Sequence, residues 1–199
     1  MKKITAAVFC MLISAAVYAA EPMFSLGLVR AGGGYAYLLE PKLDDIEAIP
    51  GSEVTKGGAS ASLQGYFGKM FGKDSFLWGL EVGYQRTYNY EFPALTTEAT
   101  FTSYPLMVAW EYDFGRRTAS IMPFLQWAAG VSIDSVKVES GGVSETTTNN
   151  DFVFAAGPGL AFKLTEKVSL DTLLRYHLFF TGADYTHTLN LTLNLGFQM

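Results

Sequence analysis

The sequence predicts an all-β fold, an eight-stranded antiparallel up-and-down barrel with both termini on the same side. Segments that alternate large apolar residues with small or polar ones recur along the chain, which is typical of strands with two different faces. The connections alternate in length, and an even number of strands with short turns on one side and longer loops on the other describes such a barrel. The short connections are 72–75, 115–118 and 165–166, and the longer ones are 38–58, 89–100, 134–151 and 180–186.

The clearest alternation runs from Asp151 to Leu178, in two arms joined by a tight turn. The even positions of the first arm include Phe152, Phe154 and Phe162, whereas its odd positions are mostly small. The second arm alternates leucines with polar residues in the same way. Because the pattern repeats, we expect eight strands. They are Met23–Tyr37, Ala59–Phe71, Phe76–Tyr88, Phe101–Phe114, Ala119–Ile133, Phe152–Leu164, Lys167–Phe179 and His187–Phe197.

The composition of the two faces indicates which one points outward. A soluble lipocalin-like barrel would turn its apolar face inward and show water a surface rich in Lys and Glu. Here the second face is mostly Gly, Ala, Ser, Thr and Asn, which suits a narrow polar interior. Aromatic residues stand toward the strand ends, as in the girdles of membrane proteins; they are Trp78, Tyr84, Tyr104 and Trp110. We therefore expect a transmembrane barrel with its apolar face toward lipid and both termini in the periplasm.

Three residues fit this pattern poorly. Arg30 stands in the same phase as Leu28, and a charge facing lipid costs about 2–4 kcal/mol. A bulge near 32–34, or an Arg30 side chain that reaches the interface, would resolve the conflict. Pro158 removes a ladder donor, so we expect a bulge at 157–159. Trp127 falls in the middle of its strand, outside either girdle.

The N-terminus predicts a signal peptide over residues 1–19, followed by one barrel domain over 20–199. Lys2 and Lys3 precede an apolar run that ends before a small-residue cleavage site. The run is shorter than the roughly 20 residues that a membrane helix needs. Cys10 is the only cysteine and lies in this segment, so the mature chain has no disulfide. Loss of two lysines moves the net charge from −5 to −7, which argues against nucleic-acid binding.

With these features the chain resembles the small eight-stranded outer-membrane barrels: OmpX, the membrane domain of OmpA, the OmpW family and the neisserial opacity proteins. The most similar pieces are 155–164, with Gly157-Pro158-Gly159, then 168–176, and 123–130. The resemblance covers the whole mature chain and is specific for architecture rather than for one activity. It implies an outer-membrane location, insertion by the barrel-assembly machinery, and a monomer. Resemblance to the OmpW family would imply a narrow channel for small or hydrophobic solutes.

Five polar residues share the inward parity and are the candidate site residues. In a barrel this narrow, inner side chains touch across the lumen, and the planar fork of arginine can bridge carboxylates. We expect an internal ion-pair network that fills the barrel, with Arg175 at its centre. The alternative is a gate whose pairs switch to open a pore. The residues are Glu81, Glu111, Asp171, Arg175 and His177.

The two histidines argue against an enzyme. Outer-membrane lipid-modifying barrels use a His with a Ser and an acid, and neither His177 nor His187 has a Ser two positions on. Two histidines so placed are no metal motif either, and we expect no cofactor. The loops 38–58 and 134–151 are either adhesive surfaces or solvated linkers. The sequence therefore favours a structural or surface-interaction role, with a narrow channel second and a lipid-modifying enzyme third.

Overall fold

The computed structural model describes residues 26–39, 50–71, 73–92, 96–115, 119–181 and 184–199. The expected signal peptide lies outside the described residues, as do the first residues of the first expected strand and positions 40–49 of the first long loop. Within the described ranges, no helix is long and apolar enough to cross a membrane.

The described chain forms one antiparallel sheet. Eight strands close into a ring in the order β1-β3-β4-β5-β6-β7-β8-β9, with β9 paired back to β1. The short β2 pairs only with the outer part of β4. The expected eight-stranded antiparallel barrel is thus confirmed. The strands are β1 Leu26–Leu38, β2 Glu53–Thr55, β3 Gly57–Phe71, β4 Asp74–Phe92, β5 Thr97–Asp113, β6 Ile121–Ser140, β7 Val143–Lys163, β8 Val168–Thr181 and β9 Asp184–Gln198.

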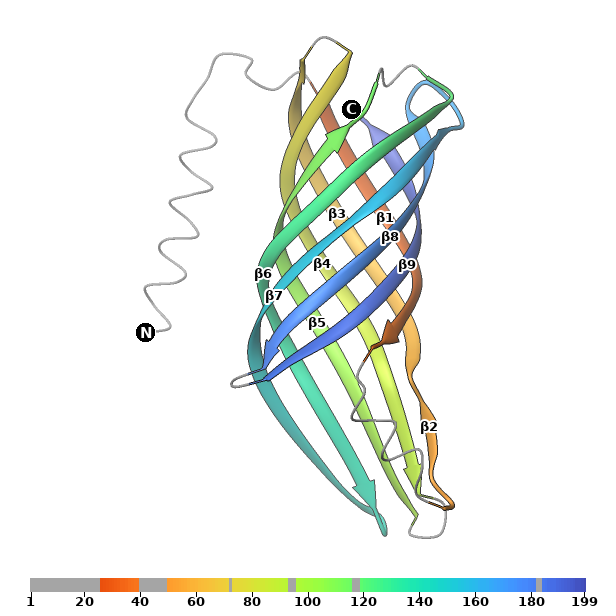
Figure 1. Ribbon diagram of the computed structural model, residues 1–199, viewed down its shortest axis with the longest axis vertical. Coiled ribbons are helices and arrows are strands. Elements are labelled where there is room, and N and C mark those ends of the chain that lie inside the picture. Colours follow the sequence, from red (N-terminus) through yellow and green to blue (C-terminus); the bar gives the residue numbers. More distant parts are fainter. Residues whose placement is uncertain (1–25, 40–49, 72, 93–95, 116–118, 182–183) are drawn as a thin grey trace, which may run out of the picture.

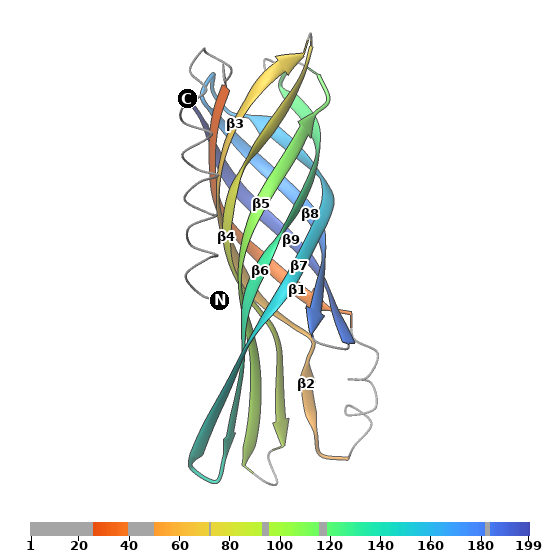
Figure 2. The same cartoon turned by 90° about the vertical axis from the view of Figure 1, so that its left-hand side faces the viewer.

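The strands extend farther at one end of the barrel than at the other. Figures 1 and 2 show the strands winding obliquely around the barrel, with the C-terminus, the start of β1 and the short connections at one end, the turn end. At the opposite end, the hairpin end, β4 to β7 continue well beyond β1, β8 and β9 (Figure 1). The barrel therefore carries an extension on one side only.

This hairpin extension comprises residues 86–92, 97–102, 135–140 and 143–148. It corrects the sequence analysis, which assigned 89–100 and 134–151 to loops. The β4–β5 ladder runs to Phe92 opposite Thr97, and the β6–β7 ladder runs to Ser140 opposite Val143. Gly141 and Gly142 have φ of 57° and 85°. Two left-handed residues in a row match the twist of a tight hairpin turn, which lets both strands continue to the tip.

The barrel wall has an apolar outer face and a mostly polar inner face. Large apolar side chains stay exposed on the outside, such as Leu63 at 51% and Leu191 at 57%, whereas Gln64 and Asn190 beside them are buried at 1% and 7%. Exposure of so many large apolar side chains is costly in water and favourable in lipid. The expected orientation of the two faces is therefore confirmed.

Two expected irregularities are absent. The β1 register runs without a shift from Leu26 to Leu38, and Arg30 faces the lumen at 2% exposure. Leu28 faces inward as well, so the parity conflict came from treating this leucine as lipid-facing. Around Pro158 the β7 register is the same on both sides against β6 and β8, so there is no bulge; the proline ring lies on the outer face, and only the β8 pairing lapses over 157–158.

The position of Trp127 has a simple explanation in the register. Trp78 stands opposite Trp110, and Trp110 stands opposite Trp127, so that the three tryptophans form one row across β4, β5 and β6. All three are partly exposed on the outer face. Trp127 also contacts Phe76, with ring centroids 6.1 Å apart. Cross-strand aromatic neighbours stabilise a sheet, and here they do so on the surface that faces lipid.

Candidate functional site

The lumen concentrates charge in a small buried volume. Among the described residues, two arginines and six carboxylates are buried inside the barrel. A buried charge is costly unless it is paired and hydrogen-bonded, so the arrangement of partners decides what the lumen can do. The buried charged residues are Arg30, Glu81, Glu111, Asp113, Asp134, Asp151, Asp171 and Arg175.

Arg175 and Glu81 form the first of two bridges across the lumen. They come from β8 and β4, which are four places apart in the ring of eight and so face each other. Nη1 of Arg175 donates to Oε2 of Glu81 at 2.7 Å, and Nη2 donates to Oε1. Arg175 Nε donates to Nε2 of His177 at 3.0 Å. His177 therefore accepts through Nε2 and carries its proton on Nδ1.

Arg30 and Glu111 form the second bridge, closer to the turn end. Arg30 Nη2 donates to Oε1 of Glu111 at 2.9 Å, and Nη1 donates to Oε2. The remaining donor, Nε, reaches Asp171 on β8. The guanidinium also lies over the Phe124 ring, with Cζ 4.5 Å from the centroid. A planar fork that binds two carboxylates and stacks on a ring is a role that lysine could not fill.

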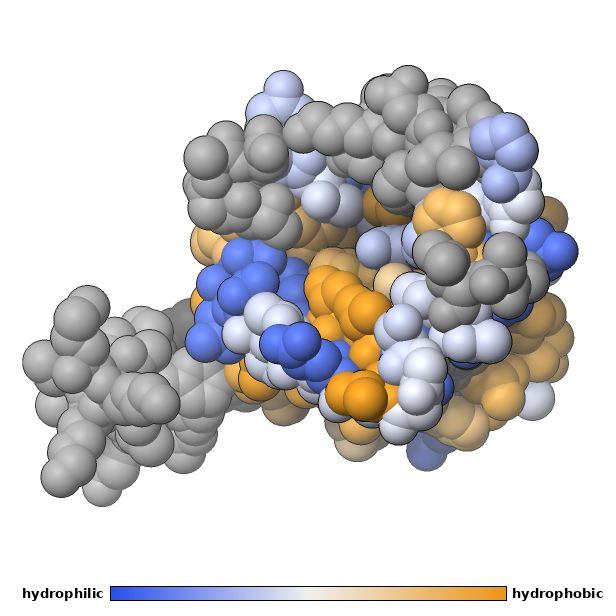
Figure 3. Space-filling model, turned by 90° about the horizontal axis from the view of Figure 1, so that it is seen from below, coloured by the Kyte–Doolittle hydropathy of each residue, from blue (hydrophilic) through white to orange (hydrophobic). Residues whose placement is uncertain are grey.

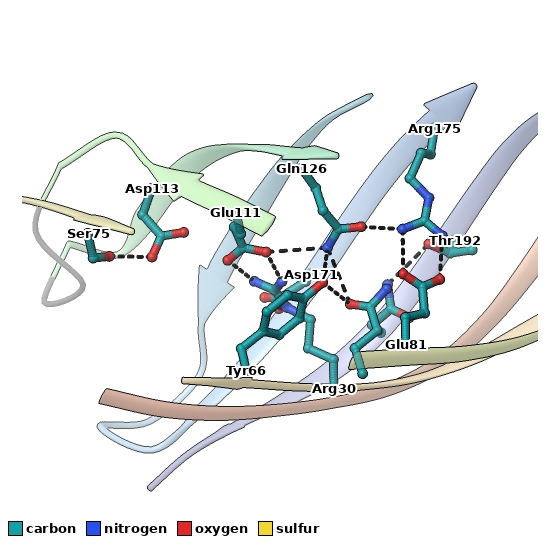
Figure 4. A network of polar contacts seen from close by, with 12 residues as sticks. Arg30, Tyr66, Ser75, Glu81, Glu111, Asp113, Gln126, Asp171, Arg175 and Thr192 are labelled. Atoms are coloured by element: carbon teal, nitrogen blue, oxygen red, sulfur yellow. Dashed lines mark hydrogen bonds and ion pairs between the residues drawn. The ribbon is translucent and has the colours of Figure 1, made fainter. Parts of the chain in front are cut away.

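Gln126 links the two bridges (Figure 4). Its Oε1 accepts from Arg175 Nη1, and its Nε2 donates to the hydroxyl of Tyr66 at 2.7 Å. The same Nε2 lies 3.4 Å from Glu111 Oε2. The amide thus offers its acceptor to one cation and its donor toward the other carboxylate, and the network is continuous from Glu81 to Asp171.

The bridges close the lumen together with apolar side chains. A cluster of Met122, Phe124, Ala161 and Leu173 fills the interior near the Arg30 bridge. The cavity next to Arg175, lined in part by Gln64, Gln85 and Asn190, measures about 10 Å³. Such a volume holds about one water molecule. In the described structure, the middle of the barrel is a filled polar core.

A second polar group lies in the lumen toward the hairpin end. Asp134 on β6 accepts hydrogen bonds from Ser103 and Ser132, the latter at 2.6 Å. Asp151 on β7 stands directly opposite Ser132 and is buried at 8%. No cluster of three or more His, Cys, Asp or Glu residues that could hold a metal occurs in the described residues.

The structure places all five candidate residues of the sequence analysis in the lumen, but in two groups. Glu81, Arg175 and His177 are in contact, whereas Glu111 and Asp171 bind Arg30. Arg175 is therefore not the single centre that the sequence suggested. Sequence reasoning did not include Arg30 in the candidate site. The available signal was that Arg30 has the same parity as Gly32 and Gly34, which are small residues typical of the inner face. Sequence reasoning also missed Gln126, because an uncharged residue at an inward position gives no signal.

The two histidines lie in different environments. His177 contacts Arg175 in the lumen, and the Nδ1 atom of His187 contacts the hydroxyl of Tyr176 on the outer face. Neither has a hydrogen bond to a serine among the described residues. A nucleophile activated by a neighbouring base needs that contact.

The hairpin extension reverses the polarity of the barrel wall. From Tyr84 and Tyr104 toward the turn end, the outward positions are apolar, as at Leu106. Toward the hairpin end, the outward positions carry Arg86 and Thr102. On the inner side, the residues change from polar to apolar in the same direction. A register shift between Arg86 and Tyr88 sets Tyr88 opposite Phe101, and the two rings stack with centroids 6.1 Å apart. Figure 3, which looks onto this end, shows hydrophobic residues between groups of hydrophilic ones.

Comparisons with known proteins agree with this architecture. The chain is similar in structure to a major outer membrane protein from Thermus thermophilus, with 11% identity, a TM-score of 0.64, and 87% of this chain and 99% of that chain covered. It is also similar to Ail, the attachment invasion locus protein of Yersinia pestis, with 18% identity, a TM-score of 0.53, and 89% of this chain and 100% of that chain covered. Neisserial surface protein A is similar with 14% identity, a TM-score of 0.53, and 86% of this chain and 96% of that chain covered. At such identities the likeness shows the fold alone.

Comparison with curated protein sequences gives no match. The family model of the outer membrane protein beta-barrel domain, however, matches residues 5–197, nearly the whole chain. The closed ring, the lipid-type outer face and the filled polar lumen agree with that match. The chain belongs to the outer membrane protein beta-barrel family.

Proposed function

We propose that this outer-membrane chain is a non-enzymatic barrel with a surface-interaction role, in which the hairpin extension carries the binding surface. The observation that supports this most is the contrast between the two halves of the molecule. Two arginine bridges fill the middle of the barrel, whereas four strands continue past it as paired, exposed hairpins. A rigid projecting sheet suits contact with a partner outside the cell.

The outer edge of β7 gives this surface a mode of binding. The β7–β8 ladder begins at Phe152, so among the described residues 143–151 pair with β6 alone. All of 143–150 is exposed, including Thr146 and Thr148. An exposed strand edge presents unpaired N–H and C=O groups to which another extended chain can add. The names of two similar proteins, an attachment invasion locus protein and a surface protein, accord with a role at the cell surface.

The two other functions receive less support. A narrow channel needs a continuous path, and the Arg175–Glu81 and Arg30–Glu111 bridges cross the lumen at successive levels. A lipid-modifying enzyme needs a base beside a nucleophile, and the described side-chain hydrogen bonds of His177 and His187 are to Arg175 and Tyr176.

Adhesion of whole cells tests the proposal. A bacterium that expresses the chain should bind surfaces coated with a polypeptide such as fibronectin or laminin more than the same strain without it. A variant that joins Asp134 to Asn149, which face each other, through an Asn-Gly turn removes the β6–β7 part of the extension and keeps the register. This variant should fold, judged by its heat-dependent mobility in SDS, and lose the adhesion. Equal adhesion with and without the β6–β7 part of the extension, together with single-channel currents from the wild type, would refute the proposal.

A further inference from the structure

The outer face of the hairpin extension contains a polar groove of about 420 Å³. It crosses β4, β5, β6 and β7, and its lining residues stand at outward positions of these strands. The volume lies within the range of small-ligand sites. The lining residues are Tyr84, Arg86, Glu98, Thr100, Thr102, Tyr104, Ser135, Lys137, Glu139 and Thr146.

The height of the groove relative to the membrane follows from its neighbours along each strand. Tyr84 and Tyr104 form the rim of the groove nearer the turn end, with ring centroids 5.6 Å apart. Toward the turn end, the next outward residues are Val82 and Leu106, which are exposed at 47% and 41% on the lipid face. Tyrosine pairs of this kind mark the boundary between lipid chains and headgroups. The groove therefore opens sideways into the headgroup layer, directly above the lipid face.

The charges of the groove are balanced. Arg86 Nη2 lies 3.7 Å from Glu98 Oε1, and Lys137 contacts Glu139. All four side chains remain between 42% and 52% exposed, so their free hydrogen-bonding positions face the groove. A site for a bare phosphate would carry an excess of positive charge, because each carboxylate repels the anion. A groove with equal donors and acceptors suits a neutral, hydroxyl-rich ligand better.

The remaining lining points the same way. Thr100 already shares its hydroxyl with Arg86 and Asn89, at 3.4 Å and 2.9 Å, which holds the cation in place. No hydrogen bond of the Thr102 hydroxyl is described, and this residue lies next to the tyrosine pair. Tyrosine rings offer flat apolar surfaces with a polar tip. Flat rings, planar charged groups and hydroxyls together match the ring faces and hydroxyl edges of a sugar.

We propose that this groove binds the saccharide headgroup of a glycolipid in the outer leaflet beside the barrel. The lipid chains of that glycolipid lie against Val82 and Leu106, and its sugars rise past Tyr84 and Tyr104 into the groove. Arg86, Lys137 and the two carboxylates bind sugar hydroxyls. The groove uses outward side chains of the extension, and of these only Thr146 belongs to the exposed β7 edge, so the proposed site does not rest on the surface-interaction role.

Retention of glycolipid in native mass spectrometry tests the site. The refolded chain is released from bilayers that contain either phospholipid alone or phospholipid with rough-type lipopolysaccharide. The wild type should retain one lipopolysaccharide molecule. Arg86→Gln with Lys137→Gln should lower the retained fraction about tenfold, and Thr102→Val should lower it less, as expected for lost hydrogen bonds. Lys69→Gln removes an exposed charge from the outer face near the turn end and is the matched control, which should leave retention unchanged.

A second pair of variants separates a sugar from a phosphate. Glu98→Ala with Glu139→Ala removes acceptors that a sugar uses and that repel an anion. The proposal predicts weaker retention in this variant and undiminished retention of a dephosphorylated lipopolysaccharide by the wild type. Stronger retention by the variant, or loss of the dephosphorylated glycolipid, would show a phosphate site instead and overturn the proposal. Equal retention by the wild type and all groove variants would show that the groove is not a binding site.

Discussion

Arg175 and Glu81 lie on strands that face each other across the barrel, and two parallel hydrogen bonds join them. Arg175→Ala should lower the free energy of unfolding by about 3–5 kcal/mol, because it leaves a buried carboxylate without its cation. Glu81→Gln in the same background should restore part of that loss. Glu111→Gln should restore none, because Glu111 binds Arg30. Urea titrations of the barrel in detergent measure all four proteins, and equal rescue by both glutamines would contradict the two-bridge arrangement.

The Arg30 bridge depends on the shape of the cation as well as on its charge. Arg30→Lys keeps the charge but cannot bind Glu111 in parallel, reach Asp171 and stack on Phe124 at once. We expect a loss of about 1–3 kcal/mol in the free energy of unfolding. Arg86→Lys, at a side chain that is 42% exposed, is the matched control and should change it little. An Arg30→Lys barrel as stable as the wild type would show that only charge matters at this position.

The two bridges close the lumen in series, which predicts how conductance responds to mutation. The wild type should give no current steps in planar bilayers. Arg175→Ala alone should remain silent, because the Arg30–Glu111 bridge and the Phe124 ring still fill the lumen nearer the turn end. Arg175→Ala combined with Arg30→Ala should give measurable currents where the double variant still folds. Currents from the Arg175→Ala protein by itself would identify this bridge as a gate.

The fold also places the three tryptophans in lipid. Because Trp78, Trp110 and Trp127 form one row on the outer face, brominated lipids should quench most of the tryptophan emission, and a water-soluble quencher such as iodide should quench little. Trp110→Phe should shift the emission of the remaining two rings, because it removes the middle member of the row. Strong quenching by iodide and weak quenching by brominated lipid would place the aromatic face in the lumen, as in a soluble barrel.

The orientation in the membrane can be tested with single cysteines. Ser140 lies at the tip of the hairpin extension and Glu166 lies in the short turn between β7 and β8; both are exposed. A membrane-impermeant maleimide should label Ser140→Cys on intact cells, and it should label Glu166→Cys only after the outer membrane is permeabilised. The chain's own cysteine, Cys10, lies in the expected signal peptide and should not interfere. The reverse pattern would mean that the hairpin end faces the periplasm.

The sequence predicted the barrel well where one rule governs a whole strand. Within the membrane, alternation between lipid-facing and lumen-facing residues is enforced at every second position, so that strands such as β3 and β8 were found within one or two residues. Beyond the membrane boundary, the outward residues become polar and the inward ones apolar. The Thr-rich stretch 144–148 therefore resembles a loop in composition, although it pairs as a strand. Local pattern could not show this, because the pairing of β6 with β7 is what makes these residues a strand.

The partners within the lumen were harder to predict than its members. Parity shows which side chains point inward, but the oblique winding of the strands decides which of them meet. Arg175 is close to Asp171 in sequence, yet it binds Glu81 across the ring, whereas Asp171 binds Arg30. These pairings follow from the stagger between strands, which alternation does not contain.

The reversal of polarity at Tyr84 and Tyr104 has a consequence for the position of the molecule along the membrane normal. If the barrel moved toward the periplasm by one outward position, which is two residues along each strand, Arg86 would enter the hydrocarbon. The cost of a charge there rises toward about 2–4 kcal/mol at the bilayer centre. If it rose by the same step, Val82 and Leu106 would be pushed into water. Both displacements raise the free energy. The distribution of charged and apolar residues on the sheet therefore fixes the depth of the barrel in the membrane and the height of the extension above the cell surface.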